Sequence, residues 1–334
     1  MFKKMLWSTD WHFGRKNSDP VSLEDNMQFI DWMIAEGKSN GCDAFVFGGD
    51  FFDSRSSINV LTLHKALEAF EKINAAFPNS FIIKGNHDLF MKESRAISSV
   101  EIARNFKNIN IIDHPMTISD VTFLPWLVGD EKRTKLAKSR YIFGHLELPG
   151  FLMNAKVELP LTSHSTDLDL FDGNEYVFTG HFHLRQQKKN IIYTGAAMPY
   201  SFSDNWDDER GIMILEYGGT PQFKAWPNQP LFRTMKLSEM LDKPDSFLTE
   251  KLTARIALDI DISYEEAQVI KETFVDDYKL RRIELVPQQK IEASQSFAEG
   301  VVFQSVDQIV VDGLMSIESS GMKPTMLVDI YRSL

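Results

Sequence analysis

The sequence contains a single cysteine and no long apolar run, and each absence excludes a class of protein. Cys42 alone cannot build a disulfide framework, which fits a reducing compartment. No apolar run approaches the roughly 18 residues that a membrane span needs. Residues 5–7, after Lys3 and Lys4, form too short an apolar segment for a signal peptide. We therefore expect a cytoplasmic protein.

The sequence also lacks an excess of positive charge. Its 36 Lys and Arg are outnumbered by 47 Asp and Glu, and the formal net charge of −11 argues against a general electrostatic attraction for nucleic acid. This objection weakens if bound divalent cations supply local positive charge. Small basic clusters occur at residues 15–16, 132–135 and 185–189. Such clusters are usually solvated surface, and contact with a substrate is the alternative for each.

Five short apolar runs each end, mostly through a glycine, in residues that bind cations. The residues that follow these runs are Asp10 and His12, Asp50, Asn86 with His87 and Asp88, His145, and His181 with His183. A short apolar run that ends in glycine is typical of a buried strand that stops in a tight turn. Asn and Asp also favour turns for purely local hydrogen bonding. Because the same arrangement recurs five times, we favour a shared site over five unrelated turns.

The spacing of apolar residues predicts an α/β fold. A helix is expected from an N-cap at Ser22 to about Gly37, and a second helix over residues 63–73. The region after residue 109 is rich in strands. We expect two packed mixed β-sheets flanked by helices, with the cation-binding turns at the carboxyl ends of the strands, where open α/β sheets place their sites.

The proline-rich segment 226–230 predicts a domain boundary, so we expect domains at 1–228, 229–287 and 288–334. The middle domain has the pattern of a small βαβ unit. Its expected elements are an alternating strand over 256–262, a helix opened by a capping box of Ser263 and Glu266, and a returning strand at Ile283 and Leu285.

The last domain is expected to be a polar linker followed by a C-terminal helical hairpin. Two apolar stripes at helical spacing, over residues 303–317 and 327–334, are separated by Gly321 and Pro324. The stripes could pack on the chain's own domains. We favour docking onto a partner chain, because the linker separates the hairpin from the core and apolar stripes need a cover.

Seven candidate ligands are too many for one tetrahedral zinc ion, and none of them is a cysteine. The candidate metal ligands are Asp10, His12, Asp50, Asn86, His145, His181 and His183. Mixed oxygen and nitrogen ligands suit two octahedral ions if one carboxylate bridges them, and Asp50 is the best bridging candidate. A pair of ions about 3.5–4 Å apart is the arrangement that hydrolyses phosphoesters.

His87 and Asp88 remain beside these ligands. We predict that His87 is the general acid that protonates the leaving oxygen, and that Asp88 orients its ring. A simple turn cap is the alternative role for Asp88. Asp53 is a weaker candidate for supporting a ligand. His64, His114 and His164 lie outside the motifs and are expected to be ordinary residues.

The ordered motifs resemble those of the calcineurin-like metallophosphoesterase superfamily. They are Asp10-x-His12, Gly49-Asp50, Gly85-Asn86-His87-Asp88, Gly144-His145 and Gly180-His181-x-His183. More narrowly, residues 10–14 and 49–53, Pro125-Trp126 and residues 193–195 resemble the nuclease subunit of SbcCD-type DNA double-strand-break repair complexes, in the compact form that phages encode. A phage-encoded version would act in the cytoplasm of the host.

This resemblance implies a ligand set for each ion, a cofactor and partners. It assigns one ion to Asp10, His12, Asp50 and His183, and the other to Asp50, Asn86, His145 and His181. It implies two Mn²⁺ ions, with Mg²⁺ as a substitute, 3′-to-5′ exonuclease activity on duplex DNA and endonuclease activity on single strands. It also implies that residues 229–287 cap the DNA, that the final helices bind an SMC-like ABC ATPase, and that two copies pair through helices of the first domain.

Two other functions compete with a nuclease. The first is a phosphatase or phosphodiesterase of the same superfamily that acts on another phosphoester. Protein phosphatases resembling this core carry an Arg soon after the second motif and a Glu at the position of Asp88, whereas this chain has Phe51, Phe52 and Asp53 after Asp50. The second is an inactive scaffold, which complete ligand motifs disfavour.

Overall fold

The computed structural model describes residues 2–134, 138–153, 157–162 and 165–287. Met1–Val286 form one compact unit. Its first sheet has six strands in the order β14-β13-β1-β2-β3-β6. These are β1 (Lys4–Ser8), β2 (Ala44–Phe47), β3 (Ser80–Ile83), β6 (Ile109–Ile112), β13 (Gly211–Glu216) and β14 (Gln222–Ala225). Strands β1, β2, β3 and β6 are parallel, so their carboxyl ends lie at one edge.

The second sheet also has six strands, in the order β11-β12-β10-β9-β8-β7. These are β7 (Met116–Ile118), β8 (Val121–Leu124), β9 (Tyr141–His145), β10 (Tyr176–Gly180), β11 (Gln186–Lys188) and β12 (Ile191–Tyr193). Here β8, β9, β10 and β12 are parallel. Trp7, Val46 and Phe81 of the first sheet share one buried core with Phe123 and Phe143 of the second. The two packed mixed sheets that the sequence predicted are therefore confirmed.

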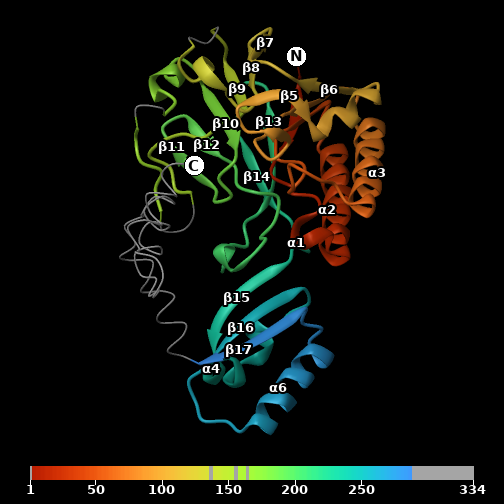
Figure 1. The fold of residues 1–334 in the computed structure, drawn as a ribbon, viewed down its shortest axis with the longest axis vertical. Coiled ribbons are helices and arrows are strands. Elements are labelled where there is room, and N and C mark those ends of the chain that lie inside the picture. The colour runs from red at the N-terminus through yellow and green to blue at the C-terminus, as the bar shows by residue number, and fades with distance from the viewer. Residues whose placement is uncertain (1, 135–137, 154–156, 163–164, 288–334) are drawn as a thin grey trace, which may run out of the picture. The chain divides into compact units, whose positions relative to one another are not determined.

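Helices α2 (Pro20–Ser39) and α3 (Val60–Ala76) lie side by side and cover the outer face of the first sheet (Figure 1). The prediction of Ser22 as the N-cap was wrong. Asp19 caps α2, because its carboxylate accepts a hydrogen bond from the Ser22 backbone N–H at 3.0 Å, and Pro20 occupies the first turn. The outer face of the second sheet is covered by loop residues, including Leu148 and Phe151, and by the 3₁₀ helix Leu168–Phe171.

Short elements connect these layers. They are α1 (Arg15–Ser18), the hairpin of β4 (Leu89–Met91) and β5 (Ser94–Ser98), and the 3₁₀ helices Ser99–Asn105, Gly129–Arg133 and Phe202–Asp204. The hairpin begins directly after the turn that contains His87. In α1, Lys16 and Asn17 have left-handed backbone angles, with φ of 53° and 58°.

A third sheet has three strands in the order β15-β16-β17, and α6 is drawn against it in Figure 1. Its elements are β15 (Leu231–Lys236), α4 (Leu237–Asp242), α5 (Pro244–Phe247), β16 (Leu252–Leu258), α6 (Tyr264–Asp277) and β17 (Arg282–Pro287). The capping box of Ser263 and Glu266 is confirmed. The predicted strand over 256–262 was misplaced, because β16 ends at Leu258. Strand β15 was not predicted at all.

The predicted linker and helical hairpin at 288–334 lie outside the described residues. Within the described part of the chain, no helix combines the length and the apolar character that crossing a bilayer requires.

Candidate metal centre

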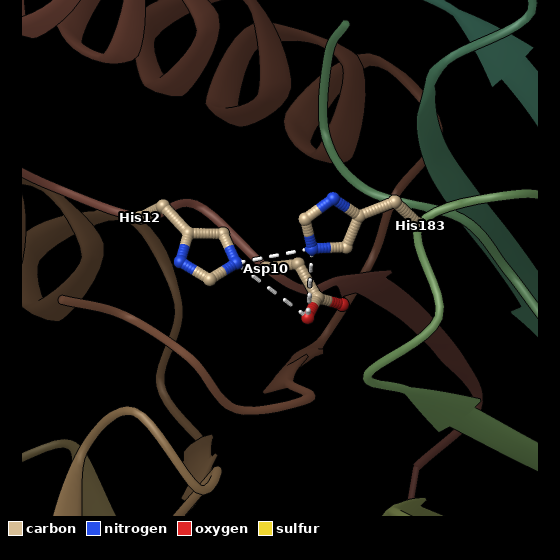
Figure 2. Close-up of side chains that lie close together, drawn as sticks. All are labelled: Asp10, His12 and His183. Atoms are coloured by element: carbon tan, nitrogen blue, oxygen red, sulfur yellow. Dashed lines mark hydrogen bonds and ion pairs between the residues drawn. The ribbon is translucent and has the colours of Figure 1, made fainter. Parts of the chain in front are cut away.

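The parallel strands bring the predicted ligands to a common edge. Asp10, His12 and His183 form the first group, and each offers one ligand atom within 4.8 Å of the others. Figure 2 shows the Nε2 atoms of His12 and His183 facing each other, 3.2 Å apart, with Asp10 Oδ1 4.0 Å from each. Neighbouring ligands of one octahedral ion at about 2.1 Å lie about 3 Å apart, so these atoms fit a shared cation.

The second group consists of Asp50, His145 and His181. Asp50 Oδ2 lies 3.3 Å from His145 Nε2, and Asn86 Oδ1 lies 3.1 Å from the same nitrogen. Asp50, Asn86 and His145 are almost fully buried. The structure thus brings the seven candidate ligands of the two sheets together in two groups. A third group among the described residues, His12, Asp53 and His87, shares His12 with the first.

Three glycines are required where the ligands approach the backbone. A Cβ atom on Gly85 would lie 2.2 Å from Asp50 Oδ1, and one on Gly49 would lie 2.5 Å from His145 Nδ1. A Cβ on Gly180 would lie 2.1 Å from Thr9 Oγ1. These distances are far below van der Waals contact. The glycines that precede the ligands therefore leave the space in which the carboxylate and imidazole groups converge.

Four of the ligand residues have left-handed backbone angles. The φ values are 54° for Asp10, 48° for His12, 58° for Asp50 and 94° for His181. Such angles are uncommon outside glycine, and they cluster where a surrounding structure holds side chains for function. Turning the backbone sharply after each strand points these side chains toward one another.

A comparison with known families agrees with this geometry. The family model of the calcineurin-like phosphoesterases matches residues 4–219. The chain belongs to this family. The match confirms the family that the five motifs predicted, and it implies divalent cations in the site. Both ligand groups of this phosphoesterase lie within the matched region.

Two of the relatives by sequence carry nuclease names. Exonuclease subunit 1 of enterobacteria phage T4 is 27% identical over 223 residues, which cover 64% of this chain and 64% of the relative. A nuclease SbcCD subunit from Staphylococcus saprophyticus is 26% identical over 248 residues, which cover 64% of this chain and 65% of the relative. The match therefore spans less than two thirds of the length of either relative.

Burial and neighbouring charges shift the pKa values of the histidines in the phosphoesterase site in different directions. Burial lowers the pKa of His181, and burial together with His12 lowers the pKa of His183 well below its usual value. Both rings are therefore neutral at pH 7, which is the form that binds metals. Burial by itself would lower the pKa of His145, but the Asp50 carboxylate outweighs it and raises that pKa to about 9.

We expect metal binding to release a proton from His145. Because its pKa of about 9 exceeds the value of about 6.5 for an unfolded histidine, the Asp50–His145 pair stabilises the metal-free fold below about pH 6.5. That stabilisation is lost as the pH rises through about 9. A cation needs the neutral ring, so calorimetric titrations at pH 7.5 in buffers of different ionisation enthalpy should report a net release of protons, to which His145 contributes. Equal heats in all buffers would contradict this assignment.

Further side chains hold the ligands in place. His12 Nδ1 lies 3.4 Å from Asp53 Oδ1, and His145 Nδ1 donates a hydrogen bond of 2.8 Å to the Gly48 carbonyl. These contacts leave Nε2 of each ring for a cation. Glu147 Oε1 lies 3.4 Å from His181 Nε2. Asp53 was a weak candidate from the sequence, and Glu147 was missed because no motif marks it.

Tyr200 was also missed. Its hydroxyl donates a hydrogen bond to the Asp10 carbonyl, and its ring meets those of His12 and His183 edge-on, at centroid distances of 5.7 Å and 5.5 Å. It is distant in sequence from every ligand motif. No periodicity or spacing in the sequence could have placed it here.

The Asp88 side chain contacts backbone N–H groups and not the His87 ring, which it was predicted to orient. The Asp88 carboxylate accepts backbone N–H groups instead: Oδ2 from Asp50 and Gly85, both at 2.9 Å, and Oδ1 from Phe51 at 2.9 Å and Phe52 at 3.2 Å. The Asp88 carboxylate therefore holds the turn after β2 to the turn after β3. This role is closer to the alternative of a turn cap than to the predicted orientation of the His87 ring.

The His87 ring is oriented by the Asp53 main chain. His87 Nδ1 lies 2.7 Å from the Asp53 carbonyl oxygen. A carbonyl only accepts, so Nδ1 carries the proton of this hydrogen bond and Nε2 is left to take up or deliver a second one. The ring centroid lies 5.0 Å from that of His12, which places His87 beside the first ligand group.

Replacing Asp88 by Asn should destabilise the fold. The amide NH₂ would face two backbone N–H donors in place of an acceptor, and the buried donors would lose their partner. We expect the free energy of unfolding of the metal-free protein to fall by about 2–3 kcal/mol, measured by urea denaturation. A change within about 0.5 kcal/mol, as at an ordinary surface position, would contradict this role of Asp88. A shifted pH profile without destabilisation would restore the ring-orienting role.

Proposed function

We propose that this phosphoesterase is a divalent-cation-dependent DNA nuclease. The observation that carries the proposal is the position of Asp50, whose carboxylate lies within the second ligand group and follows β2, next to the strand that leads to Asp10. We propose that this carboxylate bridges two ions, an arrangement that is used in phosphodiester hydrolysis. The names of the two relatives, an exonuclease subunit and a nuclease subunit, support a nucleic acid as the substrate, and the family resemblance of the motifs favours DNA.

The family resemblance of the motifs, together with the ligand groups, supports a role for each residue. Asp10, His12, Asp50 and His183 would hold one ion, and Asp50, Asn86, His145 and His181 the other. Bound cations supply positive charge to the phosphoryl oxygens and lower the pKa of a water. His87 Nε2 delivers a proton to the oxygen that leaves phosphorus, while the Asp53 carbonyl holds Nδ1–H and keeps the ring in position. Asp88 fixes the turns that carry Asp50 and Asn86.

The finer assignments rest on the family resemblance of the motifs. We propose Mn²⁺ as the activating ion, 3′-to-5′ exonuclease activity on duplex DNA and endonuclease activity on single strands. Residues 229–287 would cap the DNA, and residues 288–334 would bind an SMC-like ABC ATPase. Two copies would pair through helices α2 and α3. The names of the relatives, each one subunit of an assembly, support a partner chain.

Digestion of end-labelled DNA tests the proposed function. We expect Mn²⁺ to activate shortening of a duplex that carries its label at the 5′ end, and the readout is the ladder of labelled fragments over time. Mg²⁺ and the ATPase partner are added in separate reactions. A phosphopeptide and a cyclic nucleotide serve as competing substrates under the same conditions. Faster turnover of either one than of DNA would overturn the nuclease assignment in favour of another phosphoester.

A further inference from the structure

A cavity of about 660 Å³ opens beside the candidate metal centre. Its walls come from α1, the start of α2, the segment around Tyr200, and strands β15, β16 and β17. A volume of this size is in the range of sites that bind small molecules or parts of larger ones. Four basic residues, Arg15, Lys16, Arg281 and Arg282, contribute to the walls.

Arg15 is a buried cation without an anion. Its side chain is 7% exposed, and its Nε and Nη1 atoms have no hydrogen-bond partner among the described residues. In that part of the chain, its guanidinium donates only to the thioether of Met198, at 3.7 Å from Nη2. No described carboxylate oxygen lies within 4.0 Å of this group. Burying a charge without a partner is costly, so a missing anion is the simplest explanation.

Three other buried arginines each have the carboxylate partner that Arg15 lacks among the described residues. Arg95 pairs with Glu131, Arg210 with Asp204 and Asp207, and Arg233 with Asp208. All three are as buried as Arg15, within a few per cent. The fold therefore supplies a carboxylate to each of these buried guanidinium groups. Arg15 differs from them by facing a cavity instead.

Lys16 adds a second cation that no described carboxylate neutralises. Its amino group lies 5.3 Å from the centroid of the Phe232 ring, and no ion pair within 4.0 Å joins it to the described residues. The other charges on the walls are engaged. Arg281 pairs with Asp25, and Arg282 and Glu284 pair with each other at 3.1 Å. Asp19 caps α2. The net charge available to a ligand is positive and comes from residues 15 and 16.

The cavity is connected to the metal centre through Tyr200. The Arg15 guanidinium lies 4.0 Å from the centroid of the Tyr200 ring, and the same ring meets His12 and His183 edge-on. The Arg15 backbone N–H also donates a hydrogen bond of 3.3 Å to the His12 carbonyl. An anion at Arg15 would therefore lie next to, and not within, the group of ligands that faces the reacting phosphorus.

We propose that Arg15 and Lys16 bind a second phosphate of the substrate, one that neighbours the scissile phosphodiester along the same strand. This inference rests on the proposed function and deepens it. Arg15 supplies charge-assisted hydrogen bonds to a phosphate oxygen, and Lys16 adds a second positive charge. The chain then recognises a polynucleotide in preference to a small phosphodiester, although its overall charge is negative. Neither residue touches the reacting atoms, so both are positioning residues.

Two substrates separate this role from a structural one. The full-length, Mn²⁺-loaded protein is assayed on a single-stranded oligonucleotide, which has neighbouring phosphates, and on bis(4-nitrophenyl) phosphate, which has none. For R15Q we expect the ratio of the two kcat/KM values, oligonucleotide over small diester, to fall about tenfold or more, mostly through the oligonucleotide KM. For K16Q we expect a smaller fall and a weaker salt dependence of KM. K107Q, at an exposed lysine outside the cavity, is the matched control and should leave the ratio unchanged.

Each outcome decides a different point. If the unmodified protein hydrolyses the small diester but not the oligonucleotide, the proposed nuclease function fails. If it cleaves the oligonucleotide and both R15Q and K16Q retain the control ratio, the phosphate site is overturned while the nuclease function stands. If R15Q does not fold, the K16Q variant alone tests the proposal, because the Lys16 side chain lies at the cavity wall without a hydrogen bond to the described core. In that case an unchanged KM for the oligonucleotide and an unchanged salt dependence overturn the phosphate site.

Discussion

Replacing Asp50 by Asn is expected to lower metal-dependent hydrolysis by about a thousandfold or more. The Asp50 carboxylate lies 3.3 Å from His145 Nε2 through Oδ2 and accepts a hydrogen bond of 2.7 Å from the His87 backbone through Oδ1. A neutral amide keeps the size of the side chain but loses the charge and one of the two ligand oxygens. A loss of several kcal/mol in the stabilisation of the transition state corresponds to a thousandfold lower rate. The measurement is kcat on bis(4-nitrophenyl) phosphate with the metal content determined on the same sample.

The matched control is Asp43→Asn. Asp43 also accepts backbone hydrogen bonds, from Lys3 at 3.0 Å and Lys4 at 3.2 Å, and it belongs to neither ligand group. The same chemical change there should leave both kcat and metal content as in the unmodified protein. An Asp50→Asn protein that binds two ions and hydrolyses the diester at more than a tenth of the original rate would contradict the bridging role.

Replacing His87 by Gln is expected to reduce the rate only where the leaving oxygen needs a proton. For an oligonucleotide, whose sugar oxygen leaves as an alcohol, we expect kcat to fall by about 10²–10⁴-fold. For bis(4-nitrophenyl) phosphate the fall should be small, because nitrophenolate leaves without protonation. Metal content should be unchanged if His87 acts only on the proton, because its Nδ1 is engaged by the Asp53 carbonyl at 2.7 Å. A drop in metal content would instead favour a ligand role in the group that His87 forms with His12 and Asp53.

His64→Gln is the control for this experiment. His64 is exposed on α3 and lies outside all five motifs. It should not affect either substrate. Equal losses on both substrates for His87→Gln would indicate a role in metal binding or positioning instead of proton transfer, and no loss on either would remove His87 from the mechanism.

The ligand positions could be predicted because they depend on local pattern. Each apolar run, such as residues 81–83 or 176–178, indicates a buried strand, and the glycine after it indicates the turn. Parallel pairing then brings the ends of neighbouring strands together, as β1 with β2 and β9 with β10. This rule brings Asp10 and Asp50 together within the first sheet, whereas Asp50 and His145 come from different sheets and meet only because the two sheets pack face to face.

The supporting contacts could not be predicted, because they depend on how loops fold in three dimensions. Asp88 follows His87 in the sequence, yet its carboxylate turns away to accept N–H groups from residues 50–52. Tyr200 reaches Asp10 across 190 residues. Such contacts follow from the packing of the two sheets, which no single segment encodes.

The predicted ends of two elements were wrong because the sequence carries two competing signals there. Ser22 is a good N-cap type, but the pair Asp19-Pro20 starts the helix one turn earlier, because Asp caps equally well and Pro is favoured in the first turn. The alternation over residues 256–262 continues past the end of β16 at Leu258, where Asp259 instead accepts a hydrogen bond from the Ser238 N–H at 3.0 Å. Periodicity alone does not show where pairing stops.

The most direct test of the account is to locate Mn²⁺ by anomalous X-ray scattering from crystals of the full chain. We predict two peaks at the edge of the paired sheets. One should be bound by Asp10, His12 and His183, the other by Asn86, His145 and His181, and Asp50 should bind both. A single peak, or peaks that do not share Asp50, would contradict the central claim that the strand ends converge on a pair of cations.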